Sequence, residues 1–295
     1  MSVCNDCPRR CGIDRSASVG RCHAPEGFLV ARVSLHMWEE PPISGASGSG
    51  TIFFGGCNLG CVYCQNRAIR DGKLGEILTG DQLEEAMLSL VAEGAHNINL
   101  VTPSHYARAL VPILARVRPK LSVPIVWNSS AYETAETLRL LDGLVDVYLP
   151  DFKYASGELA SRYSAAPDYP TVAADAIREM LRQRGKIRFD EDGMAQSGVI
   201  VRHLVLPSHR KESIAAVERI AEIAPPSDVR LSLMSQYTPD FVDGDRFPAL
   251  SRRVTSFEYQ SVLDRAVALG FDGYFQSRTS ASAAFTPDFT EKRGK

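Results

Sequence analysis

The sequence contains the run Gly55-Gly56-Cys57-Asn58-Leu59-Gly60-Cys61-Val62-Tyr63-Cys64-Gln65-Asn66, directly after an apolar stretch. Its three cysteines have the spacing C-x3-C-x2-C, with no fourth cysteine nearby. Iron–sulfur clusters are usually held by four thiolates, so three would leave one iron without a protein ligand. Metal centres that perform chemistry keep such a position open. Zinc sites normally show two cysteine pairs or cysteine–histidine pairs, which this spacing fits poorly. We call Cys57, Cys61 and Cys64 the loop cysteines.

The other four cysteines, Cys4, Cys7, Cys11 and Cys22, lie near the start of the chain, and we call them the head cysteines. Four thiolates are enough to close a metal site with no position left open. A tetrahedral zinc site is one interpretation, and a second [4Fe–4S] cluster for electron relay is the other. A segment this small lacks a core of its own, which favours a bound metal with a structural role.

The bulk composition is that of an ordinary water-soluble protein: 295 residues, 44% hydrophobic and 23% charged. The 35 acidic and 33 basic residues give a net charge of −2, which indicates neither a nucleic-acid partner nor a membrane surface. No stretch approaches the length of a membrane span, and Met1–Arg10 has no hydrophobic signal region. We therefore expect a cytoplasmic protein whose thiols stay reduced and available to metals.

Short apolar runs alternate with amphipathic stretches from residue 51 onward, which predicts six β-α units and a parallel sheet. The predicted strands are Thr51–Gly56, Asn97–Thr102, Pro124–Ser129, Val145–Pro150, Val199–Pro207 and Val229–Tyr237, with Gly273–Gln276 as a final short strand. The predicted helices are Asp81–Glu93, Tyr106–Val117, Glu133–Leu141, Tyr169–Arg184, Lys211–Ile223 and Phe257–Leu269.

Three segments are predicted from this pattern: a cysteine-rich head at 1–45, a core at 46–280 and a tail at 281–295. The glycine-rich run Gly45–Gly50 precedes a strand, which is the wrong order for a dinucleotide fingerprint, and we interpret it as a flexible joint.

The C-x3-C-x2-C loop resembles the cluster motif of the radical S-adenosylmethionine (radical SAM) superfamily. The resemblance implies a [4Fe–4S] cluster on the loop cysteines, SAM bound to the fourth iron, and an electron donor such as flavodoxin or ferredoxin. It implies reductive cleavage of SAM to a 5′-deoxyadenosyl radical. Tyr63 has the place where the family usually carries an aromatic residue against the adenine. Six β-α units suit the partial (β/α)6 TIM-type barrel of the superfamily, so the expected fold is an α/β partial barrel with an N-terminal cysteine-rich metal-binding head.

Polar residues recur where the predicted strands end, and the carboxyl ends of parallel barrel strands share one site. Asp151-Phe152-Lys153 resembles the Asp-x-Lys motif of the glycyl-radical-enzyme activating branch, which implies that Lys153 contacts SAM and that Asp151 orders the site. Arg202 interrupts an apolar strand, and a buried charge needs a partner. Side chains alternate along a strand, so only one of Arg202 and His203 faces the lumen. We favour Arg202, because its strand resembles the arginine-containing strand of the activating enzymes, with His203 as a packing residue.

Further SAM contacts are expected at the remaining strand ends. Thr102-Pro103-Ser104 stands where the superfamily often carries Gly-Gly-Glu, which is absent here; the hydroxyls of Thr102 and Ser104 are the replacements we consider. Ribose contacts are expected from Asn128 and Ser130, and a nucleoside contact from Gln236 or Tyr237.

Most of the chain resembles an uncharacterised subfamily of pyruvate formate-lyase-activating-enzyme-like radical SAM proteins. The resemblance rests on the head together with Trp38–Gly45, Asn97–Pro103, Tyr148–Tyr154 and Leu233–Pro239. It implies an enzyme that abstracts hydrogen from a substrate, which is a glycine Cα of a partner protein if the analogy holds. Radical modification of a small metabolite or another peptide is the alternative enzyme function. A non-catalytic metal-binding or electron-transfer protein is the other class, although such a protein needs no polar barrel mouth.

Overall fold

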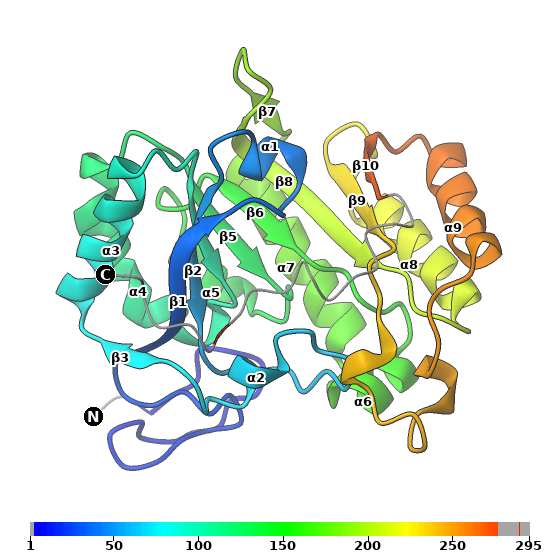
Figure 1. Cartoon of the computed structure of the whole chain (residues 1–295), viewed down its shortest axis with the longest axis horizontal. Helices are drawn as coiled ribbons and strands as arrows, with labels where there is room; N and C mark the ends of the chain where they lie inside the picture. Colours follow the sequence, from blue (N-terminus) through cyan, green and yellow to red (C-terminus); the bar gives the residue numbers. More distant parts are fainter. Residues whose placement is uncertain (1–2, 277–288, 290–295) are drawn as a thin grey trace.

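The computed structural model describes residues 3–276 and 289 of the chain. At its centre is a curved, mostly parallel sheet (Figure 1). Its strand order is β10-β9-β8-β6-β5-β4-β2-β1-β3, and β7 pairs with β8. β1 and β3 are antiparallel additions at one edge. The strands are β1 Phe28–His36, β2 Ser49–Phe54, β3 Glu76–Leu78, β4 Ile98–Val101, β5 Ile125–Ser129, β6 Val147–Pro150, β7 Arg188–Phe189, β8 Ala195–Leu204, β9 Arg230–Met234 and β10 Gly273–Phe275.

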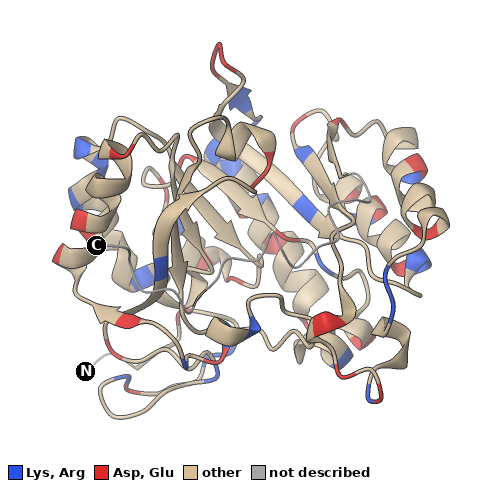
Figure 2. Ribbon diagram, viewed as in Figure 1, with Lys and Arg blue, Asp and Glu red and all other residues tan. Residues whose placement is uncertain are grey.

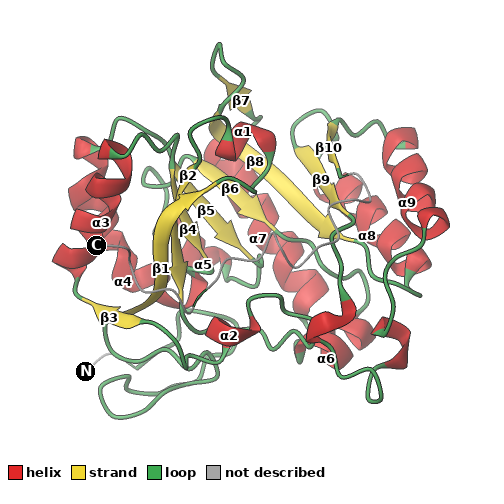
Figure 3. Cartoon of the chain, viewed as in Figure 1, coloured by secondary structure: helices red, strands yellow, loops and turns green. Residues whose placement is uncertain are grey.

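Helices connect the parallel strands and cover the outer side of the sheet (Figure 3). Thr79 and Thr255 begin α3 and α9 with reciprocal capping boxes, which satisfy backbone N–H groups that a helix start leaves free. The helices are α1 Pro41–Ser44, α2 Arg67–Arg70, α3 Gly80–Ala92, α4 Ala107–Val117, α5 Ala135–Arg139, α6 Gly157–Ser164, α7 Tyr169–Arg184, α8 Arg210–Ile223 and α9 Ser256–Ala268.

The predicted α/β partial barrel is confirmed, because the predicted β-α units are present as a parallel, partial-barrel sheet; the metal-binding head stays a prediction. The sequence interpretation missed β1, which lies inside the segment assigned to the head and pairs with β2 and β3. It also missed α6, whose eight residues are too short for a clear helical period. The run Gly45–Gly50 is not a free joint: it turns the chain at Gly45 and Gly48, both with positive φ, and enters β2 at Ser49. The predicted tail 281–295 lies outside the described residues, except for residue 289.

The inner face of the sheet changes character along the strands. Val126, Val147 and Ile200 form a buried apolar cluster with Ile43 of α1, which fills the lumen near the amino ends of the strands. Two residues further along β5 and β8, the same face carries Asn128 and Arg202, because successive side chains alternate between the two faces of a strand. The lumen is therefore packed at one end and polar at the other.

Charged residues of both signs lie on the helices and loops, and most of the sheet is free of them (Figure 2). Among the described residues, no helix is both long enough and apolar enough to cross a lipid bilayer.

Candidate active site

A cavity opens at the carboxyl ends of the parallel strands, and all three loop cysteines line it. The same cavity is lined by the predicted SAM-binding residues Tyr63, Thr102, Asn128, Ser130, Asp151, Lys153, Arg202, Gln236 and Tyr237. The structure therefore brings together side chains that are as far as 180 residues apart in the sequence, counting from Cys57 to Tyr237. This convergence follows from the parallel sheet, in which all carboxyl ends meet at one edge.

The loop cysteines are free thiols directly after β2. Burial raises the pKa of Cys57 and of Cys64 to about 12, and the neighbouring Cys61 adds to the increase in both. The ammonium group of Lys153 acts in the opposite direction on both thiols, since a nearby positive charge favours thiolates. Three negatively polarisable sulfurs beside one buried cation form a donor set that suits an iron–sulfur cluster.

The backbone of the loop fits this role at Gly56, whose φ is +85°. A Cβ at this position would lie 2.4 Å from the carbonyl oxygen of Cys22, so only glycine allows the approach. In the described residues, no group of three or more His, Cys, Asp or Glu side chains is spaced to hold a single metal ion. The ligands of a four-iron cluster bind different irons, and their spacing differs from that around one ion. The ligand assignments of both cysteine sets stay predictions.

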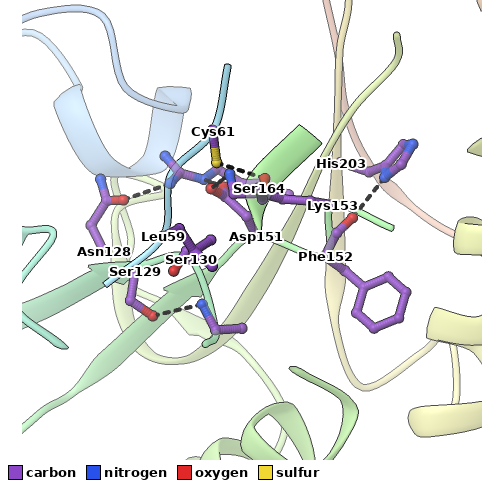
Figure 4. A network of polar contacts seen from close by, with 12 residues as sticks. Leu59, Cys61, Asn128, Ser129, Ser130, Asp151, Phe152, Lys153, Ser164 and His203 are labelled. Atoms are coloured by element: carbon purple, nitrogen blue, oxygen red, sulfur yellow. Dashed lines mark hydrogen bonds and ion pairs between the residues drawn. The ribbon is translucent and has the colours of Figure 1, made fainter. Parts of the chain in front are cut away.

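An ionic cluster centred on Asp151 occupies the polar end of the lumen (Figure 4). Its carboxylate accepts a 2.8 Å hydrogen bond from Nε of Arg202 and also pairs with Nζ of Lys153. The three side chains are only 14%, 14% and 18% exposed. Burial opposes ionisation of Asp151, but Arg202 and Lys153 together hold its pKa below the ordinary value. For the same reason the pKa of Lys153 is raised, so both groups stay charged.

Glu39 is a member of this cluster that the sequence analysis did not assign to the site. Its carboxylate lies 3.5 Å from Nη1 of Arg202 and accepts hydrogen bonds of 3.1 Å from the side-chain amides of Asn99 and Asn128. Asn128 in turn accepts a 2.5 Å hydrogen bond from Nη2 of Arg202. Burial raises the pKa of Glu39 against the opposing effect of Arg202. The sequence signal for Glu39 was the acidic pair Glu39-Glu40, which comes shortly after the unrecognised strand β1.

Of the other residues considered for the site, some line the cavity and others point elsewhere. Thr102 lines the cavity with φ of +59°, an uncommon conformation for a β-branched residue. Ser104 was predicted to contact SAM, but its hydroxyl hydrogen-bonds the buried carboxylate of Glu133 and is absent from the cavity lining. The 3-10 turn that begins at Ser104 directs it away from the cavity. His203 is buried against the carbonyl of Phe152, at 2.7 Å, as a packing residue.

The head packs directly on the cysteine loop. The backbone N–H of Cys57 donates a 3.0 Å hydrogen bond to the carbonyl of Cys22, and Nε of Arg9 donates one of 2.8 Å to the carbonyl of Asn58. Burial raises the pKa of Cys7 to about 11, and its neighbours Cys22 and Cys11 contribute to the increase. Cys7, Cys11 and Cys22 are therefore close enough to one another to interact electrostatically, and the head is in contact with the cysteine loop.

Comparisons with known proteins concern the family and the fold. Residues 51–187 match the family model of the Radical SAM superfamily. The uncharacterized protein MJ0674 of Methanocaldococcus jannaschii is 28% identical over 279 residues, which cover 91% of this chain and 75% of that relative. The crystal structure of methylornithine synthase (PylB) is similar with a TM-score of 0.50 at 16% identity. That similarity covers 74% of this chain and 63%, less than two thirds, of PylB, and it shows the fold alone.

Proposed function

We propose that the protein cleaves SAM reductively and abstracts hydrogen from a substrate. The match of residues 51–187 to the Radical SAM family model supports this proposal, because that family implies a [4Fe–4S] cluster and SAM. The observation that supports this proposal is the placement of all three loop cysteines in one cavity with Asp151, Lys153 and Arg202. When bound, the cluster and SAM supply an adenosyl radical; the protein supplies ligation, orientation and exclusion of water. The electron comes from a reductant such as flavodoxin or ferredoxin.

The protein's own residues divide into three roles. The loop cysteines bind the cluster as thiolates, which requires loss of their protons on assembly. Lys153 and Arg202 present positive charge to the carboxylate of SAM, while Asp151 and Glu39 fix both cations in place. Tyr63 and Tyr237, with ring centroids 6.2 Å apart, form an aromatic wall suited to the adenine.

We further propose that the hydrogen is taken from a glycine Cα of a partner protein. This proposal is supported by the resemblance of Asp151-Phe152-Lys153, and of the strand with Arg202, to glycyl-radical-enzyme activating proteins. Radical modification of a small metabolite or of another peptide is the alternative. For the head cysteines we propose a bound metal, either zinc or a second iron–sulfur cluster.

The radical chemistry is tested by anaerobic reconstitution, chemical reduction and measurement of 5′-deoxyadenosine. Cys61→Ala should abolish product formation and reduce the iron content of the loop. Val62→Ala is the matched control, because Val62 contributes its backbone N–H, not its side chain, to the contact with Tyr163. Product formation by Cys61→Ala at the parent rate would show that the cluster assignment is wrong.

The substrate is tested with a glycyl-radical enzyme whose glycines carry deuterium. Transfer of deuterium into 5′-deoxyadenosine supports activation of such an enzyme. Transfer from a labelled metabolite or from a different peptide, with none from glycine, selects the alternative.

A further inference from the structure

The end of α6 lies along the cysteine loop. Backbone hydrogen bonds run from Gly60 to the carbonyl of Ser164, at 3.2 Å, and from Val62 to the carbonyl of Tyr163, at 2.8 Å. Between them, the hydroxyl of Ser164 donates a 2.9 Å hydrogen bond to the sulfur of Cys61 (Figure 4). The two backbone contacts hold the loop in register, so the hydroxyl is positioned on one particular sulfur.

Two buried tyrosines continue this contact into the protein. The hydroxyl of Tyr154 lies 2.8 Å from that of Ser164, and the hydroxyl of Tyr63 lies 2.6 Å from that of Tyr154. Ser164 and Tyr154 are fully buried, and Tyr63 is 8% exposed. Water is therefore a poor competitor for these bonds, and each hydroxyl depends on its protein partners.

The number of protons available fixes the donor and the acceptor in each of these three hydrogen bonds. A cysteine thiolate has no proton and can only accept a hydrogen bond, so the single hydroxyl proton of Ser164 must point to the sulfur of Cys61. Ser164 then accepts from Tyr154, and Tyr154 accepts from Tyr63. Tyrosine hydroxyls ordinarily keep their protons at neutral pH, so both tyrosines can donate in this order. Each bond polarises the next, which strengthens the donor at the sulfur.

We propose that Ser164, oriented by Tyr154 and Tyr63, raises the reduction potential of the cluster by hydrogen-bonding the Cys61 thiolate. Reduction adds one electron from an external reductant to the cluster, and no proton moves: the hydroxyl proton stays on Ser164. The added electron increases negative charge on the ligand sulfurs, so a donor at Cys61 stabilises the reduced form more than the oxidised form. Ser164 is thus a positioning and tuning residue, and the inference rests on the proposed role of Cys61 as a cluster ligand.

The test is a redox titration of the reconstituted full-length protein without SAM, followed by the electron paramagnetic resonance signal of the reduced cluster. Ser164→Ala should lower the ratio of reduced to oxidised cluster about tenfold at a fixed ambient potential, a shift of about 59 mV for one electron. Ser161→Ala, the same change on the exposed side of the same helix, should leave the potential unchanged. Tyr154→Phe should shift the potential in the same direction by less, because Ser164 remains but loses the donor that orients it.

Iron and sulfide content separates this inference from the proposed function. A full cluster in Ser164→Ala at the wild-type potential overturns the tuning role and leaves the proposed function standing. If Ser164→Ala assembles no cluster, Tyr154→Phe decides: a wild-type potential there overturns the role, and a lowered potential supports it. If replacement of the loop cysteines by Ala leaves both the iron content and the electron paramagnetic resonance signal of the reduced protein unchanged, the ligand assignment is refuted, and the inference with it.

Discussion

Replacement of Asp151 by Asn keeps the shape of the side chain and removes the charge that holds two buried cations. Lys153 and Arg202 are 18% and 14% exposed, so most of their surface is out of water. Removal of one partner from a buried ion pair costs about 3–5 kcal/mol, because the other charge is left uncompensated. Arg202 keeps Glu39 at 3.5 Å, which offsets part of this loss. We therefore expect Asp151→Asn to lower the free energy of unfolding by about 3 kcal/mol, the lower end of that range.

The assay is urea denaturation at neutral pH, and Asp175→Asn is the control. Asp175 pairs with Arg178 at 2.8 Å, but the two side chains are 60% and 47% exposed, so their separation should cost at most about 1 kcal/mol. The folded pKa of Asp151 is lowered, so its contribution is present above the unfolded pKa of about 3.9 and is lost as the pH falls through the folded value. The difference between the wild type and Asp151→Asn should therefore shrink in acid. An effect of Asp151→Asn no larger than the control's would refute the buried-pair reasoning.

Three further outcomes are expected. Lys153→Ala should weaken SAM binding by about 1.5–3 kcal/mol in calorimetry with cluster content unchanged, and an equal dissociation constant would remove Lys153 from the SAM site. Glu258→Gln should lower the free energy of unfolding by about 2 kcal/mol at pH 7, since its carboxylate accepts from Ser208, Thr255 and Arg252. The pKa of Glu258 is lowered, mainly by Arg252, so this loss should fade below the unfolded pKa of about 4.3; a pH-independent loss would contradict it. A protein with Ala at all three loop cysteines should retain metal at the head cysteines, and free alkylation of the head thiols in the folded protein would contradict a closed site there.

The sequence predicted the site best where local pattern and topology agree. Asp151 directly follows an apolar run and Arg202 interrupts another, and the parallel sheet brings the carboxyl ends of the two strands to one edge. Strand alternation allowed only one of Arg202 and His203 to face the lumen, and the resemblance of the strand to that of the activating enzymes selected Arg202. The alternation holds in the structure because β8 has no bulge between the two residues.

The incorrect prediction for Ser104 and the missed residue Glu39 depend on local backbone geometry, which the spacing of apolar residues does not reveal. Ser104 comes two residues after Thr102, whose φ is positive, and begins a 3-10 turn, so its hydroxyl reaches Glu133 and not the cavity. Glu39 follows β1, whose last six positions are only partly buried and include polar residues, so its apolar pattern is weak. Its partners Asn99, Asn128 and Arg202 come from three other strands. Only the tertiary structure shows that these side chains satisfy one another.

The head cysteines and the loop cysteines meet next to β1, the strand that the sequence analysis missed. Cys22 and Cys57 are separated by 35 residues, and nothing in their spacing states that they touch. β1 and β2 form an antiparallel pair with Val30 opposite Phe54, so the residues before β1 and after β2 must lie side by side. The hydrogen bond from the backbone N–H of Cys57 to the carbonyl of Cys22 lies just beyond this pair of strands. Recognition of this strand pair in the sequence would have placed the head near the cysteine loop, and a substitution that shifts the register of the pair should disturb both cysteine sets together.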